Sequence, residues 1–143
     1  MSDVQKSTLV NKSFLIRDLK LRQVSNTTIF RRGDCFVLSP SVQNQHNWFD
    51  IREVNINKFN PEVHNGYLLI RFKERFLFGK LDTFQREMLR DDLIVNSSVL
   101  TPHWKFNIIE SPYTHVVNQR NKLKKYKMKD ATKEQLIRFF NKM

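Results

Sequence analysis

Two apolar runs, "GYLLIRF" (66–72) and "RFLFGKL" (75–81), are separated only by Lys73 and Glu74. Runs of this length, rich in Leu, Ile and Phe, indicate β-strands. They form either one long strand or a tight hairpin whose turn is at Lys73 and Glu74. In both cases the stretch predicts a chain that is built mainly from strands.

Outside this stretch, several other segments repeat the strand pattern. Further strands are predicted in "SFLIRDLKLRQV" (13–24), "TTIFRRGDCFVLSP" (27–40), "NWFDIREVNI" (47–56), "LIVNSSVL" (93–100), "WKFNII" (104–109) and "THVV" (114–117). A total of about eight short strands is typical of a barrel or a sandwich. We therefore predict a mainly β, barrel-like fold.

One segment between the strands has helical spacing. In "LDTFQREMLRDDL" (81–93) the apolar residues recur every three or four positions, and Asp82 with Gln85 resembles a helix-capping pair. An inserted helix near 82–92 is expected, and its apolar side should pack on the barrel.

The end of the chain has the same character. In "DATKEQLIRFFNKM" (130–143), Thr132 and Gln135 resemble a capping pair for a helix near 132–142. This C-terminal helix (131–143) should also pack on the barrel, and it is the candidate surface for a protein partner.

Length and charge restrict the possible functions. The 143 residues fit a single domain (1–143), and 25 Lys and Arg against 14 Asp and Glu give a formal net charge of +11. This excess goes beyond what solubility requires, so it favours an anionic partner.

The single cysteine and the absence of long apolar runs indicate the compartment. Cys35 permits no internal disulfide, and its apolar flank "GDCFVL" predicts a buried, inert thiol. The first 20 residues lack an unbroken apolar run, and no run approaches the roughly 18 apolar residues that cross a bilayer. We expect a cytoplasmic protein in a reducing environment, with no membrane association.

The most basic stretch is "NQRNKLKKYKMKD" (118–130), which has six Lys or Arg and no acid before Asp130. It is either a basic arm that holds an anion or a solvated connector between packed elements. We interpret it as an arm, because phosphates offset the mutual repulsion of the cations and release counterions. Tyr126 adds a flat ring that can stack on a base. The candidate contacts are Arg120, Lys122, Lys124, Lys125, Tyr126, Lys127 and Lys129.

Other candidate contacts are distributed along the chain. Arg31 and Arg32, at the Gly33–Asp34 turn, are candidates for base contacts because a guanidinium can donate two parallel hydrogen bonds. The amides of "SVQNQHNW" (41–48) can also pair with a base, or they simply form a turn. The remaining candidates are Arg17, Lys20, Arg22, Asn44 and Asn47.

A catalytic function has only one weak candidate. Asp50 and Glu53 in "FDIRE" are the nearest approach to the paired acids of a metal-dependent nuclease. The four histidines are scattered, and three glycines at 33, 66 and 79 do not form a phosphate-binding loop. We therefore expect no metal and no cofactor, and we favour a function without catalysis.

The segment "IFRRGDCFVL" (29–38) has an apolar-basic start, a Gly-Asp pair and an alternating strand. It resembles the B3-like DNA-binding domains of restriction enzymes and the PUA-like barrels that bind RNA or modified DNA. The resemblance implies two basic arms that hold DNA, one near Arg17 to Arg22 or Arg31 and Arg32 and the other near Arg120 to Lys129, and it implies a restriction or defence context.

These observations lead to a ranked set of hypotheses. The first is a non-catalytic DNA-binding module. The second is an RNA-binding barrel in which Tyr126 and Trp104 stack on unpaired bases. The third is a small nuclease that depends on a divalent metal and uses Asp50 and Glu53. The fourth is a structural protein whose charge has no role in binding.

Overall fold

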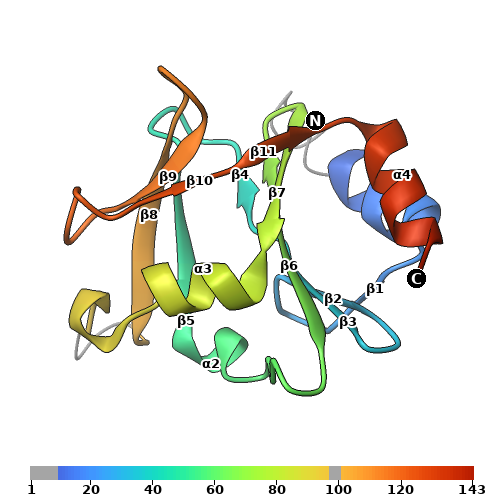
Figure 1. The fold of residues 1–143 in the computed structure, drawn as a ribbon, viewed down its shortest axis with the longest axis horizontal. Coiled ribbons are helices and arrows are strands. Elements are labelled where there is room, and N and C mark those ends of the chain that lie inside the picture. The colour runs from blue at the N-terminus through green and yellow to red at the C-terminus, as the bar shows by residue number, and fades with distance from the viewer. Residues whose placement is uncertain (1–9, 97–100) are drawn as a thin grey trace.

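The computed structural model describes residues 10–96 and 101–143, and its strands form two separate sheets (Figure 1). The larger sheet has seven strands, which are β1 (Arg22–Gln23), β2 (Ile29–Arg32), β3 (Cys35–Leu38), β4 (Ser41–Val42), β6 (Asn65–Phe72), β7 (Arg75–Lys80) and β11 (Lys129–Ala131). The smaller sheet has four strands, in the order β10 (Lys125–Lys127), β9 (His115–Asn118), β8 (His103–Ile109) and β5 (Trp48–Arg52).

The helical elements are short and lie on different sides of the larger sheet. They are the π-helix η1 (Phe14–Asp18), α2 (Glu53–Ile56), α3 (Leu81–Met88), the 3-10 helix η2 (Asp91–Leu93) and α4 (Lys133–Asn141). In Figure 1, α4 and the blue N-terminal helical segment lie to the right of the larger sheet, and the smaller sheet lies to the left. Helix α3 contacts β6 and β7 of one sheet and β10 of the other.

The predicted barrel is wrong. Within the described residues the larger sheet ends at β1 and β11 and the smaller one at β10 and β5, so the fold is a mixed α/β arrangement of two open sheets. The chain leaves β4 for β5 of the smaller sheet and then returns to β6, with which β3 and β4 pair in parallel. Periodicity along single strands carries no information about such exchanges between sheets.

The stretch 66–81 forms an antiparallel hairpin at the centre of the larger sheet, and this confirms one of the two predicted alternatives. Phe72 pairs with Arg75 across the turn, and Lys73 adopts a left-handed conformation with φ of 54°. Residues 68–72 are all buried. A strand that is covered on both faces has no polar side, which explains the nearly continuous apolar sequence.

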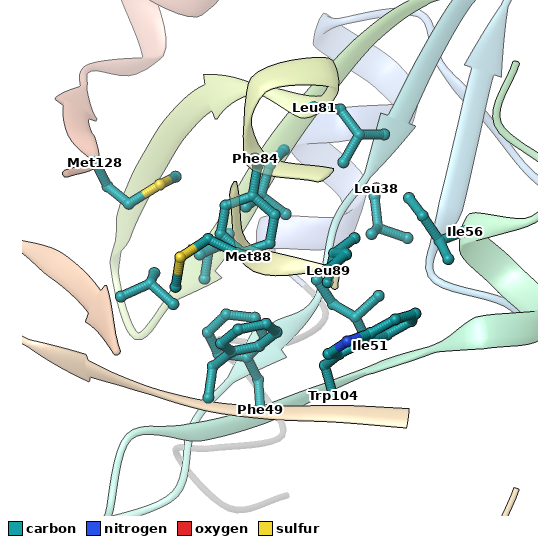
Figure 2. Packing of buried hydrophobic residues seen from close by; sticks show 14 of the residues in the cluster. Leu38, Phe49, Ile51, Ile56, Leu81, Phe84, Met88, Leu89, Trp104 and Met128 are labelled. Carbon is teal, nitrogen blue, oxygen red and sulfur yellow. The ribbon is translucent and has the colours of Figure 1, made fainter. Parts of the chain in front are cut away.

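Two hydrophobic clusters cover the two faces of the larger sheet. The inter-sheet cluster lies between the sheets, and Figure 2 shows Phe84, Met88 and Met128 together with Phe49 and Trp104. The helix-side cluster lies on the opposite face, under η1 and α4. Its members include Phe14, Leu15, Leu19, Phe30, Val37, Leu69, Phe76, Leu136 and Phe140.

The strand predicted over 13–24 is mostly wrong. The backbone N–H of Leu19 donates to the carbonyl of Phe14 at 3.1 Å, which is the i to i+5 bond of a π-helix. This winding buries Phe14, Leu15 and Leu19 against the larger sheet. The apolar residues that this helix buries account for the loose alternation in the sequence. Within 13–24, only the two residues of β1 are in a strand.

The C-terminal helix is confirmed together with its cap. The hydroxyl of Thr132 accepts the N–H of Gln135 at 3.1 Å, and Gln135 Oε1 accepts the N–H of Thr132 at 2.9 Å. These reciprocal bonds satisfy two amide groups that a helix start otherwise leaves unpaired. Helix α4 therefore begins where its sequence predicts.

The inserted helix is present but ends earlier than predicted. Helix α3 ends at Met88, and its N-cap is Lys80, which makes no side-chain capping bond, so the capping pair of Asp82 and Gln85 is wrong. In the predicted strand 93–100, Val95 forms an isolated bridge with His103. Residues 97–100 lie outside the described part of the chain.

Gly66 in β6 is expected to tolerate no side chain. A Cβ at this position would lie 2.5 Å from Phe59 Cζ and 3.1 Å from Leu81 Cβ. Because Phe59 is buried, its ring cannot move into solvent. We expect Gly66→Ala to lower the free energy of unfolding by about 1–3 kcal/mol, as overpacking does, in urea denaturation followed by circular dichroism.

Gly79 in the neighbouring strand provides the matched control. A Cβ there would meet its nearest atoms, in Met128 and Tyr126, at 3.4 Å, which is ordinary contact. Gly79→Ala should therefore leave the stability nearly unchanged. Equal losses from the two substitutions would show that steric contact with Phe59 is not the cause.

Candidate nucleic-acid interface

The basic stretch 118–130 is a hairpin followed by a crossing between the sheets. Its first residue, Asn118, ends β9, and its side-chain carbonyl accepts the N–H groups of Arg120 at 2.8 Å and Asn121 at 3.1 Å. The chain then turns into β10 and passes through Met128 to β11. The stretch is therefore part of both sheets and not a free arm.

Two residues anchor the hairpin. Met128 is buried in the inter-sheet cluster. The Tyr126 ring contacts Phe84 at 5.1 Å between ring centroids, and its hydroxyl hydrogen-bonds to that of Thr83 at 2.6 Å. Tyr126 thus has a packing role, and so does Trp104, which is buried and donates its indole N–H to the carbonyl of Arg90 at 2.8 Å.

A groove separates the hairpin from the last turn of α3. It has a volume of about 340 Å³ and is lined by Arg86, Glu87, Met88, Arg90, Leu123, Lys124 and Lys125. Four of these residues are cations and one is an acid. Carbonyl groups at a helix C-terminus carry partial negative charge, which favours a cation such as Arg86 in the last turn of α3. This effect does not account for Lys124 and Lys125, which come from the hairpin.

Ion pairs in the described residues leave the hairpin cations unmatched. The three ion pairs involve Arg75 with Glu110 and Asp130, and Arg90 with Asp92. Asp130, the acid that closes the basic stretch, thus pairs with Arg75 on β7. In this described part of the chain, the hairpin Lys residues therefore repel one another without an ion-paired carboxylate to offset the repulsion.

Arg120 is held at the edge of the hairpin. One guanidinium nitrogen donates to the carbonyl of Ile94 at 2.7 Å, which ties the hairpin to the chain after η2. Lys122, Lys127 and Lys129 are exposed. Most of the sequence-predicted cations of the stretch therefore remain accessible, whereas Lys124 and Tyr126 are half-buried.

Arg31 and Arg32 are engaged with the backbone of their own surroundings. Arg31 donates to the carbonyls of Cys35 at 3.2 Å and Gly33 at 2.9 Å. Arg32 donates to Leu19 at 3.0 Å and to Phe140, the latter near the end of α4. These bonds stabilise the turn after β2 and the docking of α4 on the larger sheet.

The structure separates the remaining predicted cations from the hairpin. Arg17 and Lys20 are exposed in and after η1, and Arg22 is exposed on β1. In Figure 1 these segments lie on the right of the molecule, whereas the β9–β10 hairpin lies at the left. These three cations therefore do not share a surface with the hairpin.

The loop 43–47 is shaped by its amides. Asn44 Oδ1 accepts the N–H groups of His46 at 3.1 Å and Trp48 at 2.9 Å, and its amide donates to the carbonyl of Trp48 at 2.8 Å. Asn47 is half-buried and has a φ of 58°. Both residues form the turn that places His46 and Trp48.

The two candidate nuclease acids belong to different elements. Asp50 is exposed on β5, whereas Glu53 is the first residue of α2 and is half-buried. In the described residues no group of three or more His, Cys, Asp or Glu is placed to hold a metal ion.

Burial shifts the pKa of two residues in the core. Burial raises the pKa of the Cys35 thiol to about 11, although the charges of Arg32 and Arg31 act in the opposite direction. The thiol is therefore protonated at neutral pH and a poor nucleophile. Burial lowers the pKa of the Arg71 guanidinium to about 10, and this group donates to Ser39 Oγ at 3.1 Å.

An aromatic and basic surface on the smaller sheet was not predicted from the sequence. We call the side of this sheet that faces away from the inter-sheet cluster the outer face. By strand alternation and register, its residues are Trp48, Asp50, Arg52, His103, Lys105, Asn107, Ile109, His115, Val117, Lys125 and Lys127, of which His103, His115 and Val117 are buried. Because side chains alternate along a strand, the apolar residues Phe49 and Ile51 imply that Trp48 lies on the opposite side of β5. This alternation could have identified Trp48 from the sequence.

Comparison with protein-family models, curated proteins and solved structures found no significant match for this chain. Among the helices of residues 10–96 and 101–143, none combines the length and apolar character needed to span a bilayer. The function must therefore be inferred from the groove and the outer face themselves.

Proposed function

We propose that the protein is a non-catalytic DNA-binding module that holds the phosphate backbone in the groove between α3 and the β9–β10 hairpin. The observation that carries the proposal is the meeting of Arg86 and Arg90 with Lys124 and Lys125 around one groove. Two separate segments contribute these cations; Glu87 lines the groove beside them, and Arg90 is ion-paired with Asp92.

The energetics support a phosphate ligand. Gathering cations on one surface is unfavourable in the free protein, and a polyanion removes the repulsion while it releases condensed counterions. Lys122 and Lys127 are exposed on the same hairpin and extend the positive surface beyond the groove. The proposal includes an intracellular setting, where DNA is present and the thiol of Cys35 would stay reduced.

The salt dependence of binding tests the proposal. We expect the variant with Arg86→Gln, Lys124→Gln and Lys125→Gln to bind a short DNA duplex with a weaker dependence on salt. The slope of log K against log salt concentration should fall by roughly 0.9 for each phosphate that the variant no longer neutralises, or about three units in total. Fluorescence anisotropy titrations at four salt concentrations measure this slope.

A charge-matched control separates local contacts from net charge. Lys58, Arg138 and Lys142 are exposed and lie outside the groove. Replacing all three with Gln removes the same number of charges and should leave the slope within about half a unit of the unmodified protein. Equal slopes for both triple variants would contradict the groove as the binding site.

Two further experiments test the alternative hypotheses. Tighter binding of duplex RNA than of duplex DNA at equal salt would replace DNA with RNA as the ligand. Plasmid cleavage with magnesium that disappears in Asp50→Ala would replace the binding function with nuclease activity.

A further inference from the structure

Two solvent-exposed aromatic rings lie on or next to the outer face of the smaller sheet. Trp48 on β5 is 42% exposed, and Tyr113, in the connection between β8 and β9, is 45% exposed. Large aromatic side chains contribute most to stability when they are buried, so two exposed rings beside one small sheet suggest a binding role. Strand spacing of about 4.8 Å places β5 and β9 roughly 10 Å apart, and the register puts Trp48 level with Val117, four residues along the chain from Tyr113.

A cation lies over each of these rings. Lys105 Nζ is 4.7 Å from the centroid of Trp48, and Lys127 Nζ is 5.7 Å from that of Tyr113. His46 stacks on Trp48 at 4.7 Å with an angle of 25° between the rings, and His115 lies 4.9 Å from Tyr113. Each ring is thus held in place by its neighbours before any ligand arrives.

The charge of this face also favours a polyanion. Its strands contribute four cations, Arg52, Lys105, Lys125 and Lys127, and one acid, Asp50. Lys125 also lines the groove beside α3. The outer face and the groove therefore share a border, and one nucleic-acid chain can contact both.

Relative strengths indicate which partner the rings prefer. A Lys over an exposed ring contributes a factor of about 2 to 5 to an equilibrium constant, whereas a base stacked on a ring contributes a factor of about 5 to 150. A base can therefore displace the ammonium group from the ring. The displaced Lys then becomes available for the phosphate next to that base.

We propose that the outer face is a stacking platform for unpaired bases of a single nucleic-acid strand, with Trp48 and Tyr113 as the stacking rings and Lys105 and Lys127 as the phosphate contacts. This proposal rests on the proposed function, because it extends the same ligand from the groove onto the sheet. It assigns to Trp48 and Tyr113 the role that sequence reasoning gave to Trp104 and Tyr126.

An oligonucleotide without bases tests the platform directly. The probes are labelled 12-nucleotide strands of thymidine and of abasic deoxyribose, which carry the same phosphates. Each ring that stacks on a base should favour the thymidine strand over the abasic strand by about 5- to 150-fold. Trp48→Ala should remove the contribution of one ring, Trp48→Ala combined with Tyr113→Ala should abolish the preference, and neither variant should change binding of a blunt 12-base-pair duplex more than twofold.

A conservative variant and a spectroscopic signal keep the test independent of folding. Trp48→Phe retains an aromatic ring and should retain most of the preference for thymidine. The chain has two tryptophans, and the other, Trp104, is buried. Quenching of tryptophan fluorescence by the thymidine strand should therefore occur in the unmodified protein and disappear in Trp48→Phe.

The outcomes distinguish this proposal from the proposed function. Salt-dependent duplex binding with no preference for thymidine over abasic strands would overturn the platform and leave the groove intact. Absence of binding to every probe would overturn both. A uridine strand that depends on Trp48 and binds more tightly than the thymidine strand would support the platform and assign it to RNA.

Discussion

Replacing Phe140 with alanine is expected to lower the free energy of unfolding by about 3–5 kcal/mol. The Phe140 side chain is fully buried in the helix-side cluster, with its ring centroid 6.1 Å from that of Tyr67 and 6.2 Å from that of Phe78. Removing the ring leaves a cavity between α4 and the larger sheet, because the sheet cannot collapse into the space. Urea denaturation followed by circular dichroism measures the decrease in stability.

The adjacent residue provides the control for this prediction. Phe139 also contacts Tyr67 and Phe78, each at 5.1 Å between ring centroids, but it is 36% exposed. Phe139→Ala should therefore cost less, about 1–2 kcal/mol, which is the range of a partly buried aromatic contact. Equal effects at the two positions would contradict the burial assigned to α4.

Phe106→Ala is expected to have an effect of similar size, about 3–5 kcal/mol, through the other cluster. Phe106 on β8 is fully buried, and its ring lies 5.3 Å from that of Phe49 and 5.4 Å from that of Phe84. It therefore connects the smaller sheet with α3, which borders the basic groove. The same urea denaturation applies.

Ile109, at the end of the same strand, is the control for Phe106. It is 36% exposed, so Ile109→Ala should cost about 1 kcal/mol or less. Both Phe variants should keep a single unfolding transition, because β6 contributes to both clusters. Two separate transitions in the unmodified protein would contradict this shared core.

Local features of the fold could be predicted from the sequence. The hairpin of residues 66–81 was among the stated alternatives because its two apolar runs are separated by only two residues. The helix α4 was predictable because its cap and its apolar spacing are both local. The barrel was wrong because sheet membership depends on contacts between distant segments, and in the described residues β4 and β5 belong to different sheets.

The candidate site was only partly predictable for the same reason. The cations of 118–130 are visible in the sequence, but the groove also needs Arg86 and Arg90, which are more distant in the chain and reach the hairpin only through folding. In the RNA hypothesis Tyr126 and Trp104 were the stacking rings, because both lie beside cations in the sequence. Trp104 is buried and Tyr126 is half-buried, whereas strand alternation places Trp48 on the exposed side of its strand.

The open sheets also have a consequence for how copies of this chain meet. An end strand offers unpaired backbone N–H and C=O groups to the end strand of another molecule, and such pairing leads to aggregation. Of the four end strands in the described residues, β5 has five residues and carries Asp50 and Arg52. The other three are shorter: β1 has two residues and carries Arg22, and β10 and β11 have three residues each and carry Lys125, Lys127 and Lys129. Short, charged ends of this kind repel a second copy. The lysines proposed to hold phosphate thus also help to keep the molecules apart.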